Sequence, residues 1–105
     1  MGTDTIVAIA TALTNSGLGI IRISGEEAIE TADKVISLKS GKKLFACDSH
    51  TIHYGFVKDG ERIVDEVMVA LMKAPKSYTR EDTVEINCHG GVLVMQLIMG
   101  LLLKK

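Results

Sequence analysis

Runs of β-branched and aliphatic residues mark the strands that this chain is expected to form. Such runs occupy residues 5–10, 20–23, 63–72 and 83–88. Residues 51–57 instead alternate, with Ile52, Tyr54 and Phe56 on one side, which is the two-residue period of a strand whose two faces differ. The turn sequence Lys-Asp-Gly-Glu at residues 58–61 predicts a hairpin between this strand and the strand over residues 63–72.

Two other stretches have the spacing of helices. Ser24 and Glu27 match a capping box, in which two side chains satisfy backbone N–H groups at a helix start. The apolar positions that follow share one helical stripe, namely Ala28, Ile29, Ala32, Val35 and Ile36. The stretch from Val92 to Leu103 is apolar on almost every side, so we expect a second subunit, a continuation of the chain, or both to cover it.

Together these elements predict an α+β (α/β) domain with a mixed sheet of about five strands and two or three helices packed on it. The expected order is two strands, a helix, a hairpin, a strand and a helix. Residues 67–72 are apolar on both sides, which favours a central place in the sheet. A chain of 105 residues corresponds to one domain, and its two Phe, two Tyr and no Trp require an aliphatic core.

Charge and hydropathy narrow the function classes. The net charge is −1, so we expect no strong nucleic-acid binding by this domain alone, because surfaces that hold phosphates are basic. The longest apolar stretch is interrupted by Gln96 and Gly100 and is too short to cross a bilayer. The expectation is a cytoplasmic protein that makes no use of a membrane.

A lone arginine and a lone glutamate project from otherwise apolar strands. In residues 83–88 the strand period places Glu85 with Thr83 and Asn87 on one face, and Arg22 shares a face with Ile20 in the earlier strand. Such residues belong to a solvent-facing strand surface, to an ion pair across neighbouring strands, or to a binding site.

The segment His89-Gly90-Gly91 stands between the last strand and the last helix. Backbone N–H groups at a helix start can receive an anion, and glycines there can equally serve a tight turn. The sequence contains no Gly-x-x-x-x-Gly-Lys-Ser/Thr phosphate loop, so this chain alone is not expected to hydrolyse GTP.

Cysteines and histidines offer a further candidate chemistry. Cys47, His50 and His53 are spaced in threes, and Cys88 and His89 could add metal ligands. However, no Cys-x-x-Cys knuckle is present, and two adjacent residues of an extended strand point apart, which disfavours a Cys88–His89 pair. We therefore assign no metal site and no catalytic residue from the sequence.

Four segments taken together resemble the amino-terminal domain of the MnmE (TrmE) family of tRNA-modification GTPases. They are DTIVA at residues 4–8, GLGIIRISG at 17–25, SYTREDTVE at 77–85 and CHGG at 88–91. Their order and spacing extend the resemblance from residue 4 to about residue 100. The family usually has glycine where Arg80 stands, and this difference leaves Glu85 in register.

The resemblance implies a fold like the folate-binding domain of glycine-cleavage aminomethyltransferases. It also implies a homodimer that binds 5-formyl-tetrahydrofolate, with Arg22 and Glu85 as the folate-contacting residues. A further folate-contacting lysine, after a Pro-Gly-Glu-Phe motif, is expected beyond residue 105. Residues 1–105 thus correspond to a single, nearly complete amino-terminal domain. The helical and GTPase domains of the family, the latter with its GTP, Mg and K, are absent from it, as is the carboxy-terminal cysteine motif.

Family members act with an MnmG-type flavoprotein to modify the wobble uridine of tRNA. The expected function is therefore that of the folate-binding and homodimerisation domain of such an enzyme, without GTPase activity of its own. Two alternatives remain open at this point. One is a purely structural dimerisation module, and the other is a small metal-binding regulator built on Cys47, His50 and His53.

Overall fold

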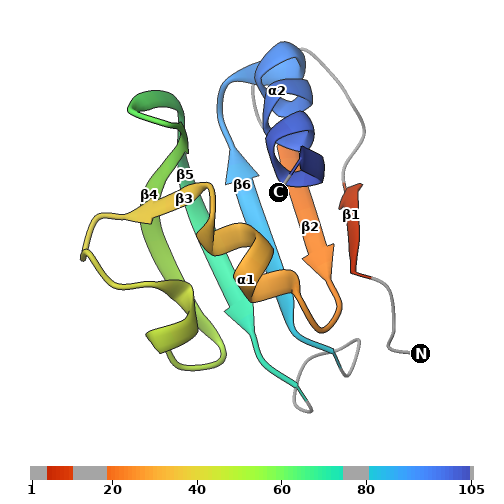
Figure 1. The fold of residues 1–105 in the computed structure, drawn as a ribbon, viewed down its shortest axis with the longest axis vertical. Coiled ribbons are helices and arrows are strands. Elements are labelled where there is room, and N and C mark those ends of the chain that lie inside the picture. Colours follow the sequence, from red (N-terminus) through yellow and green to blue (C-terminus); the bar gives the residue numbers. More distant parts are fainter. Residues whose placement is uncertain (1–4, 11–18, 75–80, 105) are drawn as a thin grey trace.

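The fold is a single antiparallel sheet with its helices on one side (Figure 1). The computed structural model describes residues 5–10, 19–74 and 81–104. The strands, in chain order, are β1 (Ile6–Ile9), β2 (Gly19–Ser24), β3 (Ile36–Leu38), β4 (Thr51–Asp59), β5 (Arg62–Met72) and β6 (Thr83–Cys88). They form one sheet in the order β1-β2-β6-β5-β4-β3, in which every neighbouring pair is antiparallel.

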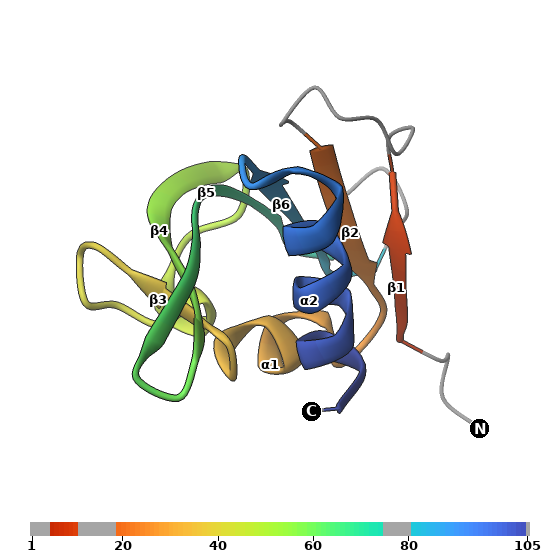
Figure 2. The same ribbon diagram turned by 90° about the horizontal axis from the view of Figure 1, so that it is seen from above.

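The helices are α1 (Ala28–Asp33) and α2 (Gly91–Lys104), with a short 3-10 turn η1 (Leu44–Ala46). Both lie inside the curve of the sheet, as Figure 2 shows from above. Between helices and sheet the core is aliphatic, as predicted: Ile21, Ile23, Val69, Val84 and Ile86 are fully buried. Each such side chain contributes roughly 1.5–3 kcal/mol of hydrophobic stabilisation.

The strand predictions are confirmed, and the sheet differs from the expectation in two ways. It is antiparallel throughout the part of the chain that the structure describes, not mixed, and it has a sixth strand, β3. Val35 and Ile36 were predicted to continue the first helix, which instead ends at Asp33. Their burial needs no helix, because Ile36 pairs with Val57 of β4 and faces the core from there.

The capping-box prediction is wrong for a related reason. Ser24 belongs to β2, where it pairs with Thr83 of β6 and with Ile6 of β1. The helix begins later, at Ala28, and Glu27 precedes it without a side-chain capping bond. Ser24 therefore pairs within the sheet, although the capping-box motif had assigned it to the start of the helix.

Close packing of β3 on β4 depends on one glycine. A Cβ added to Gly55 would lie 2.7 Å from the carbonyl oxygen of Ser37, which is too close for any real contact. Since the obstacle is backbone, a side chain at this position would push β3 away from the sheet.

The closing helix α2 forms as predicted, and the sheet covers one side of it. Met95, Ile98, Leu101 and Leu102 are buried against the core. Leu93, Leu97 and Leu103 remain 76%, 50% and 69% exposed. In the described part of the chain, no helix is long and apolar enough to span a membrane. The predicted connection at residues 77–82 lies mostly outside the described residues.

Candidate functional site

The candidate site is the sheet face that lies opposite the helices, here called the open face. Strand alternation and register place the following side chains on it: Ile6 and Ala8, Ile20 and Arg22, Glu85 and Asn87, Met68 and Ala70, and Ile52, Tyr54 and Phe56. Ile6, Ile52, Tyr54 and Met68 are among the exposed large apolar side chains of the chain. A face of this kind suits a ligand or a partner rather than bulk water.

At the centre of the open face, the structure brings the two sequence-predicted site residues together. Arg22 and Glu85 stand directly opposite each other in the β2–β6 register. The Nε atom of Arg22 donates to Oε2 of Glu85 over 2.8 Å, and Nη2 lies 2.7 Å from the same oxygen. Of the possibilities left open by the sequence, the cross-strand ion pair is therefore the one that this structure contains.

The Arg22–Glu85 pair is only partly protected from solvent. The Arg22 side chain is 40% exposed and that of Glu85 18%. Solvent screens a pair at this depth, so the pair stabilises the fold by about 1 kcal/mol or less.

Further polar contacts lie beside the pair and toward β4. Asn87 donates from Nδ2 to the carbonyl oxygen of Met68 over 3.3 Å. The Tyr54 hydroxyl donates to the carboxylate of Glu66, and this bond raises the pKa of the tyrosine. Tyr54 also contacts Phe56 edge-on, with ring centres 5.5 Å apart. These contacts fix the aromatic side of the face near β4.

The His89-Gly90-Gly91 segment is a turn whose N–H groups already have an acceptor. The backbone N–H groups of His89 and Gly90 donate to Oδ2 of Asp65, over 2.7 and 3.2 Å. Gly91, with a φ of +84°, adopts the left-handed conformation that favours glycine. The backbone N–H groups that the sequence offered to a bound anion are therefore hydrogen-bonded to the carboxylate of Asp65 within the chain. The sequence does offer one indication of this role for Asp65. It is an acidic residue two positions before Val67, so the strand period places it on the same face as that buried side chain.

The cysteines and histidines do not gather. In the described ranges no three His, Cys, Asp or Glu side chains are placed to hold a metal ion, which leaves the metal-binding alternative without support. Burial, and secondarily the charge of Asp65, raises the pKa of the Cys88 thiol to about 12. This thiol therefore stays protonated and is a poor nucleophile at neutral pH.

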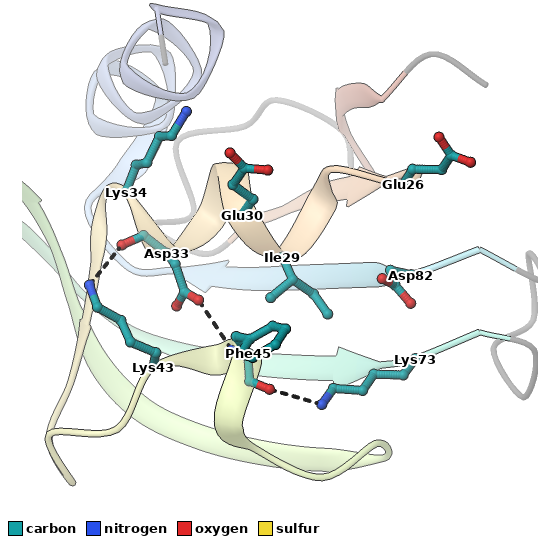
Figure 3. Close-up of a pocket in the computed structure, with 9 residues that line it drawn as sticks. All are labelled: Glu26, Ile29, Glu30, Asp33, Lys34, Lys43, Phe45, Lys73 and Asp82. Atoms are coloured by element: carbon teal, nitrogen blue, oxygen red, sulfur yellow. Dashed lines mark hydrogen bonds between the residues drawn. The ribbon is translucent and has the colours of Figure 1, made fainter. Parts of the chain in front are cut away.

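A pocket on the helix side of the sheet was not singled out by the sequence. It has a volume of about 770 Å³ and lies between α1 and η1 (Figure 3). Ile29 and Asp33 point from α1 toward Phe45, whereas Glu30 and Lys34 point away. Asp33 accepts the N–H groups of Leu44 and Phe45, over 2.7 and 3.1 Å. The charges around the pocket have both signs, so they define no single class of ligand.

The fold is that of a small α/β domain whose helices cover one face of the sheet. The sequence matches the family model described as "GTP-binding protein TrmE N-terminus" over residues 5–105, and the chain belongs to that family. This confirms the resemblance found from the four sequence segments.

Three relatives match the chain over a part of their own length. It is 53% identical to the tRNA modification GTPase MnmE of Lachnoclostridium phytofermentans over 99% of this chain and 23% of the relative. It is 47% identical to that of Bacillus subtilis over 97% of this chain and 23% of the relative. For that of Clostridioides difficile the identity is 49%, over 97% and 22%. The chain thus spans less than a quarter of the length of these relatives.

Proposed function

We propose that the chain is the folate-binding and homodimerising domain of a tRNA modification GTPase, and that it binds 5-formyl-tetrahydrofolate on its open face. The observation that carries the proposal is the Arg22–Glu85 pair, which lies on the exposed apolar face of the sheet. Family membership supplies the biological context, since the relatives are named as tRNA modification GTPases. A fold like the folate domain of the aminomethyltransferases is part of the same proposal.

The chemistry of a pterin suits a strand-borne carboxylate. One edge of the pterin carries an amino group beside a ring N–H, and a carboxylate can accept both hydrogen bonds at once. Glu85 makes these bonds, while Arg22 turns toward a carbonyl or carboxylate group of the folate. The apolar neighbours on the open face flank the ring.

Exchanging the ion pair for the ligand is energetically reasonable. The partly exposed pair is worth about 1 kcal/mol or less. A hydrogen bond between a neutral and a charged group contributes roughly 1.5–3 kcal/mol when it excludes water. Two or more such bonds to the folate outweigh the one pair that is lost.

The homodimer uses the outer face of α2. Leu93, Leu97 and Leu103 are exposed along it, and nothing lies within 4 Å of the position of a Cβ added to Gly100. An apolar helix surface with a small residue permits close approach of a second helix. In the whole protein, this domain serves a cytoplasmic enzyme that acts on tRNA with an MnmG-type flavoprotein. GTP, Mg and K belong to its GTPase part.

Titration calorimetry of the purified chain with 5-formyl-tetrahydrofolate tests the folate proposal. Saturable binding with one folate per chain is expected. Dimerisation without any folate binding would instead favour the purely structural dimerisation module. One observation favours that alternative, namely the hydrogen bond that Arg22 already donates to Glu85.

A further inference from the structure

A single row of residues crosses the open face through the ion pair. The strand registers place Ala8 opposite Arg22, Arg22 opposite Glu85, Glu85 opposite Ala70, and Ala70 opposite Ile52. Residues directly opposite each other in an antiparallel sheet have Cβ atoms about 4.5–5.5 Å apart. The charged pair is therefore flanked on each side by the smallest side chain that a strand normally carries.

The two alanines differ in what surrounds them. Ala8 lies on β1, the edge strand, so no further strand walls off its outer side. Ala70 lies on β5, inside the sheet, with Glu85 on one side and Ile52 on the other. Met68 and Met72 precede and follow Ala70 by two positions, so they project from the same face. Ala70 is consequently a short side chain between two methionines, beside the carboxylate of Glu85.

Alanine is an unusual residue for this position. Interior strands favour β-branched and aromatic side chains, and alanine is depleted in them. The buried face of β5 follows the rule with Val67, Val69 and Leu71, all fully buried. The departure occurs only on the open face, next to Glu85, where a larger side chain would fill the space beside the carboxylate.

We propose that Ala70 determines ligand specificity by seating the flat ring of the pterin. The ring lies over the Ala70 methyl group between Met68 and Met72, with its amino edge on Glu85. This inference rests on the proposed folate function and names the side of the ion pair that the ring occupies. Methionine sulfur packs favourably on flat unsaturated rings, and the flexible side chains of Met68 and Met72 can close on both sides of the ring.

The test enlarges the side chain at position 70 and leaves Arg22 and Glu85 unchanged. Ala70→Ile adds a strand-favouring side chain on an uncovered face, so the fold should be retained, as thermal unfolding would verify. Binding of 5-formyl-tetrahydrofolate, measured by calorimetry, should weaken by roughly tenfold or more. Ala8→Ile makes the same change on the other side of the pair and shows whether the ring lies there instead. Ala46→Ile, on η1 and away from the open face, is the control, and its affinity should stay within about threefold of the parent. Should Ala70→Ile fail to fold, the smaller change Ala70→Val takes its place with the same criterion.

A free pterin without the glutamate tail serves as the second probe. It should lose affinity by the same factor as the whole folate in Ala70→Ile, because the inference concerns the ring alone. If the parent binds folate and Ala70→Ile binds it equally well, this inference is overturned and the proposed function stands. If Ala8→Ile weakens binding and Ala70→Ile does not, the ring lies on the β1 side and the inference is likewise wrong. If the parent binds no folate, the proposed function itself fails, and this inference fails with it.

Discussion

The carboxylate of Asp65, on β5, accepts the backbone N–H of His89 over 2.7 Å and that of Gly90 over 3.2 Å. Both residues belong to the turn that leads from β6 into α2, so Asp65 fixes this turn. A negative charge near a helix start also interacts favourably with the helix dipole. We therefore expect Asp65→Ala to lower the free energy of unfolding by about 0.5–1.5 kcal/mol, the usual net contribution of a hydrogen bond.

Urea unfolding followed by circular dichroism measures the effect of Asp65→Ala. Asp59→Ala is a matched control, since Asp59 is an exposed aspartate at the end of β4. It should leave the unfolding midpoint nearly unchanged. Equal midpoints for the parent and Asp65→Ala would show that the two hydrogen bonds of Asp65 contribute nothing to stability.

Glu85→Gln should weaken the binding of 5-formyl-tetrahydrofolate by roughly tenfold to a hundredfold, as expected for one lost charge-assisted contact. The change keeps the shape of the side chain and replaces one acceptor with a donor that faces the donors of the pterin. Calorimetry of parent and variant measures the difference. Glu30→Gln makes the same chemical change on the exposed side of α1, so its affinity should match the parent. Undiminished binding by a folded Glu85→Gln protein would refute the role of Glu85.

Leu97→Asp should raise the dissociation constant of the dimer by roughly tenfold or more, because an ionised carboxylate would have to enter an apolar contact. Leu97 is half exposed, so the fold of each protomer should survive the change. Sedimentation velocity over a range of micromolar concentrations gives the equilibrium. Ile52→Asp introduces the same charge on the open face and should leave the dimer intact. The opposite result would assign dimerisation to the open face.

Alkaline pH should destabilise the fold through Cys88. The pKa of its thiol is raised from the usual value near 9 to about 12 in the folded chain, chiefly by burial. Above pH 9 the unfolded chain loses this proton first, so stability that is fully present below pH 9 is lost progressively as pH rises toward 12. Urea unfolding at about pH 8 and about pH 10.5 should show a larger loss for the parent than for Cys88→Ala. Equal losses in the two proteins would contradict this.

The sequence was most informative where one face of an element is buried. Strand alternation places Ile21 with Ile23 and Val84 with Ile86 on faces opposite Arg22 and Glu85, and all four of these apolar side chains are buried. The short strand β3 was missed because Ile36 also fits the stripe of the preceding helix. Only pairing with β4, a contact between distant residues, decides between the two. The spacing of apolar residues around Ile36 fits a helix and a strand equally well.

The site was partly predictable for a similar reason. The pattern identifies Arg22 and Glu85 as charges on apolar strands, but it cannot say that β2 and β6 are neighbours. Asp65 was not recognised, since its partners are backbone groups 24 and 25 residues away. Strand order and hydrogen bonds between distant residues are properties of the assembled fold, and no short window of sequence contains them.

The pairing of β2 with β6 also bears on how the chain reaches its native state. Arg22 and Glu85 are 63 residues apart, whereas β4 and β5 meet through a turn of two residues. Closing a long loop costs more entropy than closing a short one, so the β4–β5 hairpin can form early and the β2–β6 ladder only late. The open face is thus assembled near the end of folding. A chain still emerging from the ribosome has no such face until the residues of β6 have been released, however well formed its hairpin is.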